Sequence, residues 1–531
     1  MFSATTYLIL IVVFALIALI IKDRKANSKK QKRLSRVVVD RGEKLNNNKI
    51  ENLMEAPGPR PLPIIGSLHI LGKHDFPYKS FSELATYYNS QVIKITLGRL
   101  PCVIINGLDN IKEVLFTKNY DFDSRPNFVR YNRLFGGDKG NSFAFSDWTE
   151  LQKSRREMLR NHTFPRAFTY RYHELNVMIA SEVENLLAHL DRPVDPMKVA
   201  VKPLVLNTCA NIFTGYLCGQ TFDWSDNCFR QMVKNFDMIF WEVNEGYAAD
   251  FIPMLLPFHR NNIKKIVQAT HDIRKFVVQH IVADRKQNWI PKNTDEYSES
   301  LSGGVVDQEQ GCYLDNLIEH IQTNASPEMT WDNALYALED IIGGHAAIGN
   351  FLVKIFGYLV THQHIQKQAQ KEIDSLNIND NTVGLEYKKS LPYIEGIILE
   401  AIRLIASPIV PHVANKDSSV AGYRIEKDTF IFLNNYQLNM SNELWKNPEA
   451  FDPTRFITSE NKILKPDFFL PFGGGRRSCM GYKLVLYVSF SVLASLLKNF
   501  TILPSENQVY KVPIGKLALP EVTFNFRFER R

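Results

Sequence analysis

The sequence predicts a mainly α-helical protein with small β-sheets, an α+β fold preceded by a single transmembrane helix at the N-terminus. Three observations support this prediction. The region from about residue 165 to 405 has the periodicity and composition of helices. The first 21 residues carry no charged side chain. Short runs rich in β-branched and aromatic residues predict strands before and after the helical region, at 91–96, 102–106, 422–425 and 429–433.

The N-terminal run from Tyr7 to Ile21 is apolar throughout, and residues 2–6 can extend it. About 20 apolar residues suffice to cross the core of a bilayer as a helix. A cleaved signal peptide would need a basic region before the run and a small-residue cleavage site after it, and the sequence shows neither. We therefore predict a transmembrane signal anchor over residues 1–21.

The segment 22–56 is a predicted basic stem. Residues 22–49 hold eleven Lys or Arg and three acidic residues, a net charge of +8, which leaves −1 for the rest of a chain whose net charge is +7. A basic flank directly after an apolar span favours the cytosolic side of the membrane, so we expect a cytosolic body. The position of the charge indicates binding to anionic lipid and no binding to nucleic acid.

The body after the stem begins with alternating prolines. Residues 57–67 predict a stiff, non-helical hinge, because proline fixes φ and lacks an N–H donor. Residues 68–531 contain no internal repeat, low-complexity tract or linker, and we predict one catalytic domain there. The six cysteines have no framework spacing, which favours a reducing compartment.

A cysteine-bearing turn lies near the C-terminus. The run Phe472–Gly481 reads F-G-G-G-R-R-S-C-M-G and precedes an apolar helical run from about Lys483 to Leu497. Glycines let a backbone approach a flat ligand closely. The start of a helix just after Cys479 favours thiolate over thiol, and Arg477 can donate two hydrogen bonds to a carboxylate. Together these residue types predict a thiolate ligand to haem iron.

The same run fits F-x-x-G-x-R-x-C-x-G at every fixed position, and by it the chain resembles the membrane-bound, microsomal cytochrome P-450 family. The resemblance covers most of residues 57–531. It implies haem b with Cys479 as the axial ligand and with Phe472, Arg477 and Gly481 at the haem. It also implies the endoplasmic reticulum membrane, a small lipophilic substrate, and electrons from NADPH through NADPH–cytochrome P-450 reductase, with cytochrome b5 as an optional second partner.

Two charged motifs keep the order of this family. Glu400 and Arg403 are three positions apart in an apolar helical run and can pair. Downstream, residues 451–456 resemble the family's F-x-P-E-R-F, with Thr454 where that pattern has Glu. The resemblance implies that Glu400, Arg403 and Arg455 form a structural network around the haem.

Three further positions concern the haem propionates. Family members typically have a cation four residues after the tryptophan at the position of Trp148, where this chain has Gln152. Arg155 returns to the Trp148 face of a helix at i+7, so we expect Trp148 with Gln152 or Arg155 near a propionate. The alternative is that Lys153, Arg155 and Arg156 form a solvated basic face, or a surface that docks an acidic reductase. The resemblance assigns His412 to a propionate as well.

The chain departs from the family in a long helix predicted from about Trp331 to His362. Most members read A/G-G-x-D/E-T in its middle, where the acid and the alcohol relay protons to dioxygen. This chain keeps Gly343 and Gly344, but has Ala346 and Ala347 in place of the acid and the alcohol. We expect the glycines to leave room for dioxygen, and protons to come from ordered water, Asn350 or a hydroxyl of the substrate.

This departure leaves several functions open. The leading hypothesis is a monooxygenase whose relay is completed by water or by the substrate. The alternatives are a reductase-independent haem-thiolate isomerase or dehydratase, a haem-binding sensor, and a P-450 that oxidises xenobiotics or fatty acids. The run 339–350 and the continuation Gly481-Tyr482-Lys483 resemble the insect ecdysteroid-producing spook/spookier branch. That resemblance implies an early sterol oxidation in the synthesis of moulting hormone.

Overall fold

The computed structural model describes residues 53–74, 76–288, 311–325, 328–405 and 410–531. The predicted anchor over residues 1–21 and most of the basic stem lie outside the described residues. The described chain forms two compact units. The first takes its residues from Met1–Pro126, Tyr247–His259 and Pro411–Gln437, and the second from Asn127–Gly246, Arg260–Val410 and Leu438–Arg531.

The first unit is built on a four-stranded sheet of order β1-β2-β6-β3. β1 (Val92–Leu97) and β2 (Leu100–Ile105) are an antiparallel hairpin, β6 (Phe430–Leu433) is parallel to β2, and β3 (His412–Val413) is antiparallel to β6. The strands predicted at 91–96, 102–106 and 429–433 are therefore confirmed within a residue or two. Gly98 between β1 and β2 has a φ of +60°, which glycine adopts without strain.

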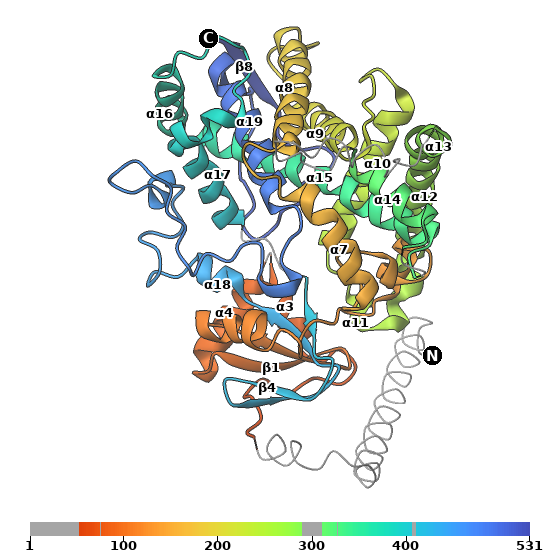
Figure 1. Ribbon diagram of the computed structural model, residues 1–531. Helices are drawn as coiled ribbons and strands as arrows, with labels where there is room; N and C mark the ends of the chain where they lie inside the picture. The colour runs from red at the N-terminus through yellow and green to blue at the C-terminus, as the bar shows by residue number, and fades with distance from the viewer. Residues whose placement is uncertain (1–52, 75, 289–310, 326–327, 406–409) are drawn as a thin grey trace, which may run out of the picture. The chain divides into compact units, whose positions relative to one another are not determined.

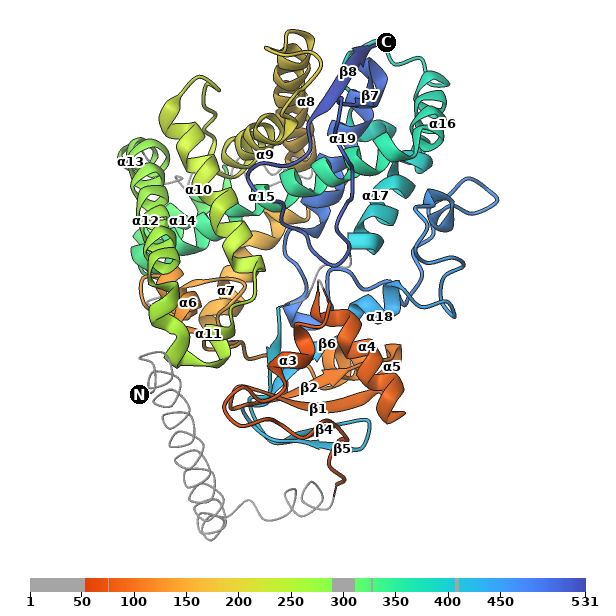
Figure 2. The same ribbon diagram turned by 180° about the vertical axis from the view of Figure 1, so that it is seen from behind.

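A second hairpin and several short helices complete this unit. The strand predicted at 422–425 is present as β5, paired with β4. Figure 2 shows β4 and β5 beside β1, and α3, α4 and α5 on the same unit. The bounds are β4 (Ser418–Val420), β5 (Tyr423–Ile425), α3 (Leu68–Leu71), α4 (Pro77–Tyr88), α5 (Leu108–Lys112), η1 (Glu113–Thr117), α11 (Ala248–Phe251) and η3 (Pro253–His259).

The proline-rich segment lies along the edge of β1. The Lys94 N–H donates to the Pro57 carbonyl at 2.9 Å, and the Ser67 N–H donates to the Thr96 carbonyl at 2.5 Å. A Cβ on Gly58 would collide with the Lys94 backbone, so glycine is needed for this close approach. The prolines leave no competing N–H donors, and the segment is bound to the first unit through its carbonyls and its few free amides.

The second unit is mostly helical, as predicted. Its central helix α15 (Trp331–Thr361) has the bounds expected from the sequence within one residue. The Thr330 hydroxyl accepts the Asn333 N–H at its start, a typical N-cap. Helices α9, α10, α14, α17 and α19 pack against it (Figure 1). Among the described residues, α15 alone is long and apolar enough to cross a membrane, but 78% of its most apolar window is buried inside the protein, as in a core helix.

The remaining elements surround α15. A two-stranded antiparallel sheet, β7 (Phe500–Pro504) with β8 (Phe526–Arg530), closes the C-terminal part. The helix α18 (Asn435–Asn439) spans the sequence boundary of the two units. The other helices are α6 (Val129–Leu134), η2 (Lys139–Asn141), α7 (Glu150–Thr163), α8 (Tyr170–Asp191), α9 (Val201–Cys218), α10 (Asn227–Asn244), α12 (Arg260–Phe276), η4 (Val277–Val282), α13 (Ala283–Gln287), α14 (Tyr313–Gln322), α16 (Gln363–Asp374), η5 (Leu385–Ser390), α17 (Pro392–Ile405), η6 (Pro453–Phe456), η7 (Gly475–Arg477) and α19 (Tyr482–Asn499).

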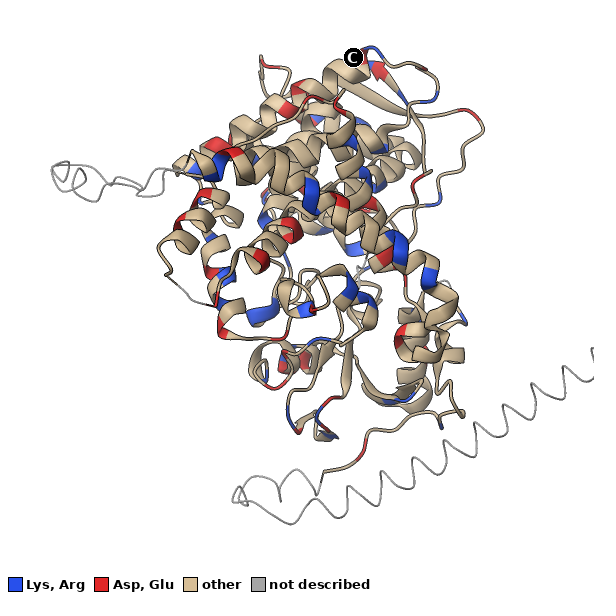
Figure 3. Cartoon of the chain, turned by 90° about the vertical axis from the view of Figure 1, so that its right-hand side faces the viewer, with Lys and Arg blue, Asp and Glu red and all other residues tan. Residues whose placement is uncertain are grey.

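Charged residues are mixed over the described body. Figure 3 shows basic and acidic residues interspersed along the helices and loops. This pattern agrees with the net charge close to zero that the sequence leaves for residues 50–531.

Candidate functional site

The turn that carries Cys479 is closed by backbone hydrogen bonds. The Cys479 N–H donates to the Phe472 carbonyl at 2.9 Å, and the Gly473 N–H donates to the Leu470 carbonyl at 3.2 Å. Gly473 and Gly475 have φ values of +70° and +59°, a region that favours glycine. The turn leads into α19, so the cysteine lies a few residues before the start of an 18-residue helix.

Cys479 is accessible although it lies deep within the protein. It is the one exposed residue of the run 472–480. Burial among the surrounding protein atoms raises the pKa of its thiol, while the Gly481 N–H and the Arg156 guanidinium lower it. The amide and the cation both stabilise the thiolate form.

Three arginines surround the indole of Trp148. The guanidinium carbons of Arg476, Arg477 and Arg156 lie 4.9, 5.9 and 6.0 Å from its ring centroid. Arg156 also donates to the Ser478 carbonyl at 2.5 Å, and Arg477 donates to the Ser146 carbonyl. Burial lowers the pKa of Arg156 to about 10, so it stays charged at neutral pH. The site thus brings three cations and an aromatic ring next to the cysteine turn.

Arg155 and Gln152 are directed elsewhere. Arg155 donates to the carbonyls of Gly140 at 3.0 Å, Asn141 at 3.4 Å and Asn333 at 3.3 Å. Gln152 donates to the Phe143 carbonyl at 2.7 Å. Both side chains are buried and bind the segment that precedes Trp148 to the rest of the unit. The structure therefore favours Arg156, which the sequence reasoning did not select, as the cation of α7 at this site.

The reason for this difference is where α7 begins. The N-cap is Thr149, with an extended backbone (φ −136°, ψ 168°), and its hydroxyl accepts the Gln152 N–H at 3.1 Å. Trp148 lies before the N-cap and is not part of the helix. Counting i+7 from Trp148 assumed a helical position that the residue does not have, so the spacing does not indicate which cation lies beside the indole.

Glu400, Arg403 and Arg455 form one buried network. Arg403 donates to Glu400 through Nε at 2.8 Å and Nη2 at 2.7 Å, and both side chains have no exposed surface. Arg455 Nε donates to the same carboxylate at 3.1 Å, as does the Asp452 N–H at 2.9 Å. Thr454 bonds to the Asp452 carboxylate, so the absent glutamate of the family pattern does not disrupt the network. Four donors on one carboxylate stabilise its charge away from water.

His412 belongs to the first unit, in β3. Its Nδ1 lies 2.6 Å from the Phe122 carbonyl, so Nδ1 carries the hydrogen of the neutral ring. Arg125 of the same unit donates to the Pro411 carbonyl at 3.4 Å. These contacts orient the imidazole through its neighbours in the first unit. Its role at a propionate stays a prediction.

One side of α15 is open. Five of its residues are partly exposed: Tyr336, Asp340, Gly343, Gly344 and Ala347. The other residues from Ile341 to Asn350 are buried. The spacing of these five residues places them on one face of a helix. We refer to them as the open face. Ala347, at the position of the family's alcohol, therefore lies on the open face, whereas Ala346, at the position of the acid, is fully buried.

The two glycines also pack tightly. A Cβ on Gly343 would lie 2.9 Å from the Phe236 ring of α10, and a Cβ on Gly344 would lie 3.3 Å from the Phe213 ring of α9. The first distance is below van der Waals contact and the second is close to it. The glycines consequently let α15 approach two aromatic rings, in addition to any space that they leave on the open face.

Asn350 is fully engaged away from the open face. Its amide donates to Asp237 and to the Ala346 carbonyl, both at 2.8 Å, and its carbonyl oxygen accepts the Leu519 N–H at 2.8 Å. Its predicted role as a proton donor therefore has no support from its contacts. His345 is buried too, with Nδ1 2.7 Å from the Ile342 carbonyl and its ring edge-on to Phe236. Burial lowers its pKa to about 4, which keeps it neutral.

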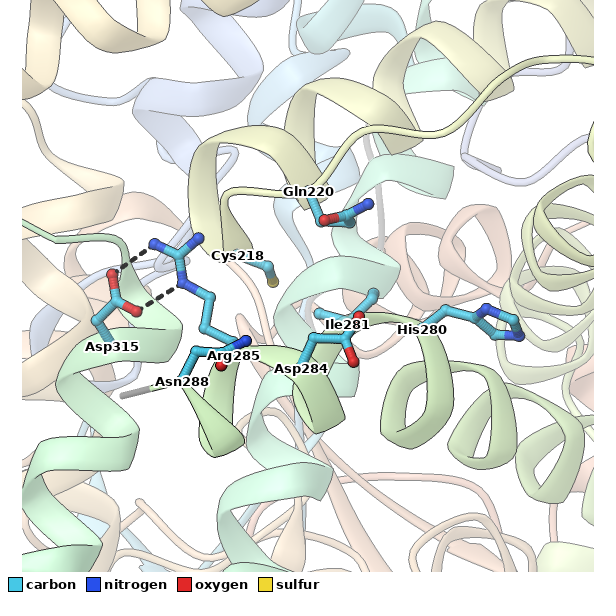
Figure 4. A pocket seen from close by; sticks show the side chains of 8 residues that line it. All are labelled: Cys218, Gln220, His280, Ile281, Asp284, Arg285, Asn288 and Asp315. Carbon is cyan, nitrogen blue, oxygen red and sulfur yellow. Dashed lines mark hydrogen bonds and ion pairs between the residues drawn. The ribbon is translucent and has the colours of Figure 1, made fainter. Parts of the chain in front are cut away.

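A polar pocket of about 460 Å³ lies elsewhere in the second unit (Figure 4). Two of its charged residues pair with each other, because Arg285 donates to Asp315 through Nε at 2.7 Å and Nη2 at 2.8 Å. The pocket shares no residue with the Cys479 turn or the open face of α15. Its full lining is Cys218, Gln220, His280, Ile281, Asp284, Arg285, Asn288 and Asp315.

The residues around Cys479 fit an iron porphyrin. The Cys479 thiol can bind the iron once it ionises, and the glycine turn lets the backbone approach the macrocycle. The three arginines beside the indole can pair with the two acidic side chains of the macrocycle. Within the described ranges, no group of three or more His, Cys, Asp or Glu residues could hold a metal ion by itself.

Comparison with known proteins agrees with this geometry. Residues 56–528 match the family model described as Cytochrome P450. The chain is 34% identical over 520 residues to Cytochrome P450 307a1 of Drosophila melanogaster, covering 93% of this chain and 92% of that protein. It is 30% identical to Cytochrome P450 1A1 of Sparus aurata, over 85% of each chain, and 28% identical to Cytochrome P450 1A1 of Mesocricetus auratus, over 88% of each.

Proposed function

The chain belongs to the cytochrome P450 family and is a monooxygenase of that family, and from this premise we propose that it oxidises a sterol in an early step of ecdysteroid synthesis. The observation that carries the chemistry is the position of Cys479, an accessible thiol between the Gly481 N–H and the Arg156 cation. Both groups act against the burial that raises the pKa of this thiol, and they favour the thiolate that a haem-thiolate enzyme requires.

The haem-binding residues are part of the proposal. Cys479 is the axial ligand, and Arg156, Arg476 and Arg477 pair with the propionates next to Trp148. Charge-assisted bonds from guanidinium to carboxylate hold and orient such groups. His412 remains a predicted contact of a propionate. Arg155 is bonded to three backbone carbonyls, so Arg156 takes its place in the proposal. When bound, the haem supplies the activation of dioxygen, and a thiolate ligand favours cleavage of the O–O bond.

The substrate class follows from two likenesses. The chain resembles the ecdysteroid-producing branch in the run 339–350, and its identity to the 307a1 protein extends over nearly the whole chain. The open face of α15 offers small side chains at Gly343, Gly344 and Ala347, which suits a large, rigid, apolar substrate. A sterol with a hydroxyl group has this shape and polarity.

The partners and the location follow from the same premise. We propose that NADPH–cytochrome P450 reductase delivers the electrons, with cytochrome b5 as a second donor. The enzyme is anchored in the endoplasmic reticulum membrane by residues 1–21, with its catalytic body in the cytosol. The basic stem adds attraction to anionic lipid.

The test uses the full-length, haem-loaded enzyme in vesicles with reductase, NADPH and a sterol extract. We expect mass spectrometry to detect a sterol product that gains one oxygen atom from isotopically labelled dioxygen, and only when NADPH is present. The Cys479→Ser protein is the matched control and should form none. Conversion without NADPH and without label would instead establish the isomerase or dehydratase. Oxidation of xenobiotics or fatty acids but of no sterol would contradict the substrate class.

A further inference from the structure

Monooxygenation consumes protons that this chain must supply. One dioxygen, two electrons, two protons and a C–H bond give one C–OH bond and one water, and NADPH provides the electrons. Ala346 and Ala347 carry neither an acid nor a hydroxyl. Asn350 and the neutral His345 are bonded and directed away from the open face. The proton source must therefore be a different group, and any candidate among the described residues has to border the open face.

Asp340 is the one carboxylate on the open face. It precedes Gly343 by three residues, Gly344 by four and Ala347 by seven. At these spacings all four residues lie on the same face of the helix. Seven residues correspond to about 10 Å along the helix axis, a span of a few water molecules. Gly343 and Gly344, between Asp340 and Ala347, have no side chain of their own and stay partly exposed, although the rings of Phe236 and Phe213 lie against one side of them.

Asp340 is paired with a hydroxyl. The Ser142 Oγ donates to Oδ2 of Asp340 at 2.8 Å, and the Phe143 N–H donates to the same oxygen at 2.8 Å. The Ser142 oxygen in turn accepts the N–H groups of Ala144 at 3.0 Å and Phe145 at 3.1 Å. Ser142 is fully buried. An acid and an alcohol, the two groups missing at 346 and 347, are thus held together about two turns earlier on the helix.

The surroundings of Asp340 favour a carboxyl that can hold a proton. Burial raises its pKa above the ordinary value, while bonds from Ser142, Phe143 and Ala144 and the charge of Arg155 on α7 lower it, with the increase larger. The other charged neighbour is Glu339 on the same helix, which burial raises to a pKa of about 7 and which pairs with Arg274. General acids work best when their pKa approaches the working pH.

We propose that Asp340 and Ser142 are the proton-supplying pair of this enzyme. They deliver protons along water over Gly343 and Gly344 to the open face of α15, in place of an acid and an alcohol at positions 346 and 347. This inference rests on the monooxygenase activity and names how its protons arrive. The competing reading is that Asp340 only anchors the segment before Trp148, and the experiment distinguishes the two.

The principal variant is Asp340→Asn in the full-length, haem-loaded enzyme. The amide oxygen can still accept from Ser142 or Phe143, but the side chain no longer carries an acidic proton. We expect the fraction of NADPH recovered as product to fall about tenfold, with the remainder appearing as hydrogen peroxide. The solvent deuterium isotope effect on turnover should change, whereas haem content and the thermal midpoint should not.

Two controls identify the acid. Glu339→Gln removes the adjacent buried carboxylate, which pairs with Arg274 off the open face, and it should leave coupling and the isotope effect unchanged. Infrared titration of the resting protein provides a readout that needs no turnover. Glu339, whose pKa burial raises to about 7, contributes a protonated carboxyl band as well as Asp340, so the variants are needed to assign the bands. A band that persists above the ordinary Asp range should remain in Glu339→Gln and be absent from the double variant Glu339→Gln with Asp340→Asn.

Rescue separates proton supply from anchoring. Adding Ala347→Thr to Asp340→Asn installs a hydroxyl on the open face without touching the Ser142 segment, and it should recover part of the lost coupling. If Asp340 only anchors the segment, Asp340→Asn lowers the thermal midpoint or haem content and the added threonine restores nothing, which overturns the proposal. If Asp340→Asn does not fold, Ser142→Ala replaces it, with the same expected loss of coupling.

Failure of this inference is distinguishable from failure of the proposed function. Unaltered coupling and an unaltered isotope effect in Asp340→Asn, with sterol oxidation intact in the parent enzyme, would reject the proton-supplying pair alone. Absence of NADPH-dependent oxidation in the parent enzyme would reject the function, and the infrared titration would still report on the carboxyl of Asp340.

Discussion

Arg156 donates a 2.5 Å hydrogen bond to the carbonyl of Ser478, the residue directly before Cys479. The bond joins α7 to the cysteine turn and places the cation where it lowers the pKa of the thiol.

Arg156→Ala should weaken haem retention, because a buried hydrogen bond from a charged donor contributes about 1.5–3 kcal/mol. Haem content after dialysis is the measurement, and Arg160→Ala, an exposed cation one turn later on α7, is the control that should have little effect.

Cys479→Ser should yield a folded protein that has lost thiolate ligation. A serine hydroxyl keeps the size of the side chain but is not ionised at neutral pH, so it cannot replace the soft thiolate. The carbon monoxide difference spectrum of the reduced protein should lose the long-wavelength band characteristic of haem-thiolate proteins. Cys228→Ser, which alters the other exposed cysteine, should keep it. Survival of the band in Cys479→Ser would exclude this residue as the ligand.

Arg403→Ala should prevent accumulation of the haem-loaded protein. It leaves the Glu400 carboxylate buried with only Arg455 and a backbone amide, and removal of one partner of such a pair lowers stability by about 3–5 kcal/mol. Thermal unfolding and haem content measure the effect. The exposed pair Lys462 and Glu460 is the control, since Lys462→Ala should change stability by less than about 1 kcal/mol.

His345 should make the protein sensitive to acid. Its pKa is lowered by burial to about 4, whereas an unfolded histidine titrates near 6.5, so the unfolded state binds the proton first as the pH falls. The stability that its neutral form provides is complete above about pH 6.5 and is lost between about 6.5 and 4, in total about 3 kcal/mol. His345→Asn, which keeps a donor for the Ile342 carbonyl, should flatten the dependence of unfolding free energy on pH in that window. An unchanged slope would contradict the prediction.

Ala347→Thr alone should not improve the parent enzyme. On our proposal its protons come through Asp340 and Ser142, and the added side chain would crowd the open face, where we propose that the substrate binds. We expect unchanged or lower sterol oxidation, together with unchanged peroxide release. Quantitative product analysis at equal NADPH consumption is the measurement. A several-fold gain in coupled turnover would mean that the parent enzyme lacks an adequate proton supply.

The sequence predicted those parts of the molecule whose signals are local. The bounds of α15 and α19 follow from apolar periodicity, and the cysteine turn follows from its glycines and cations. The partner of Trp148 was not predicted, because its position depends on where α7 begins and not on residue spacing. The pairing of Asp340 with Ser142 joins residues 198 positions apart, and a single sequence carries no signal for such a contact.

The proline-rich segment was predicted only in part. Its lack of helix follows from the prolines, but its attachment to β1 through the Pro57 and Thr96 carbonyls requires knowledge of which strand edge is free. His412 illustrates the same limit, since the Phe122 carbonyl that orients its ring is 290 residues away in the chain. Sequence patterns predict helices and strands, whereas the hydrogen-bond partners of polar groups depend on how these helices and strands pack in the folded protein.

The contact between Gly343 and Phe236 has a consequence for engineering this helix. A side chain at position 343 would press on the ring of Phe236 in α10, whatever groups stand at positions 346 and 347. The glycine at 343 and the residues at 346 and 347 are therefore under separate constraints, one steric and one chemical. A variant that restores an acid or an alcohol leaves the steric constraint in place, so the glycine alone does not report how the helix moves protons.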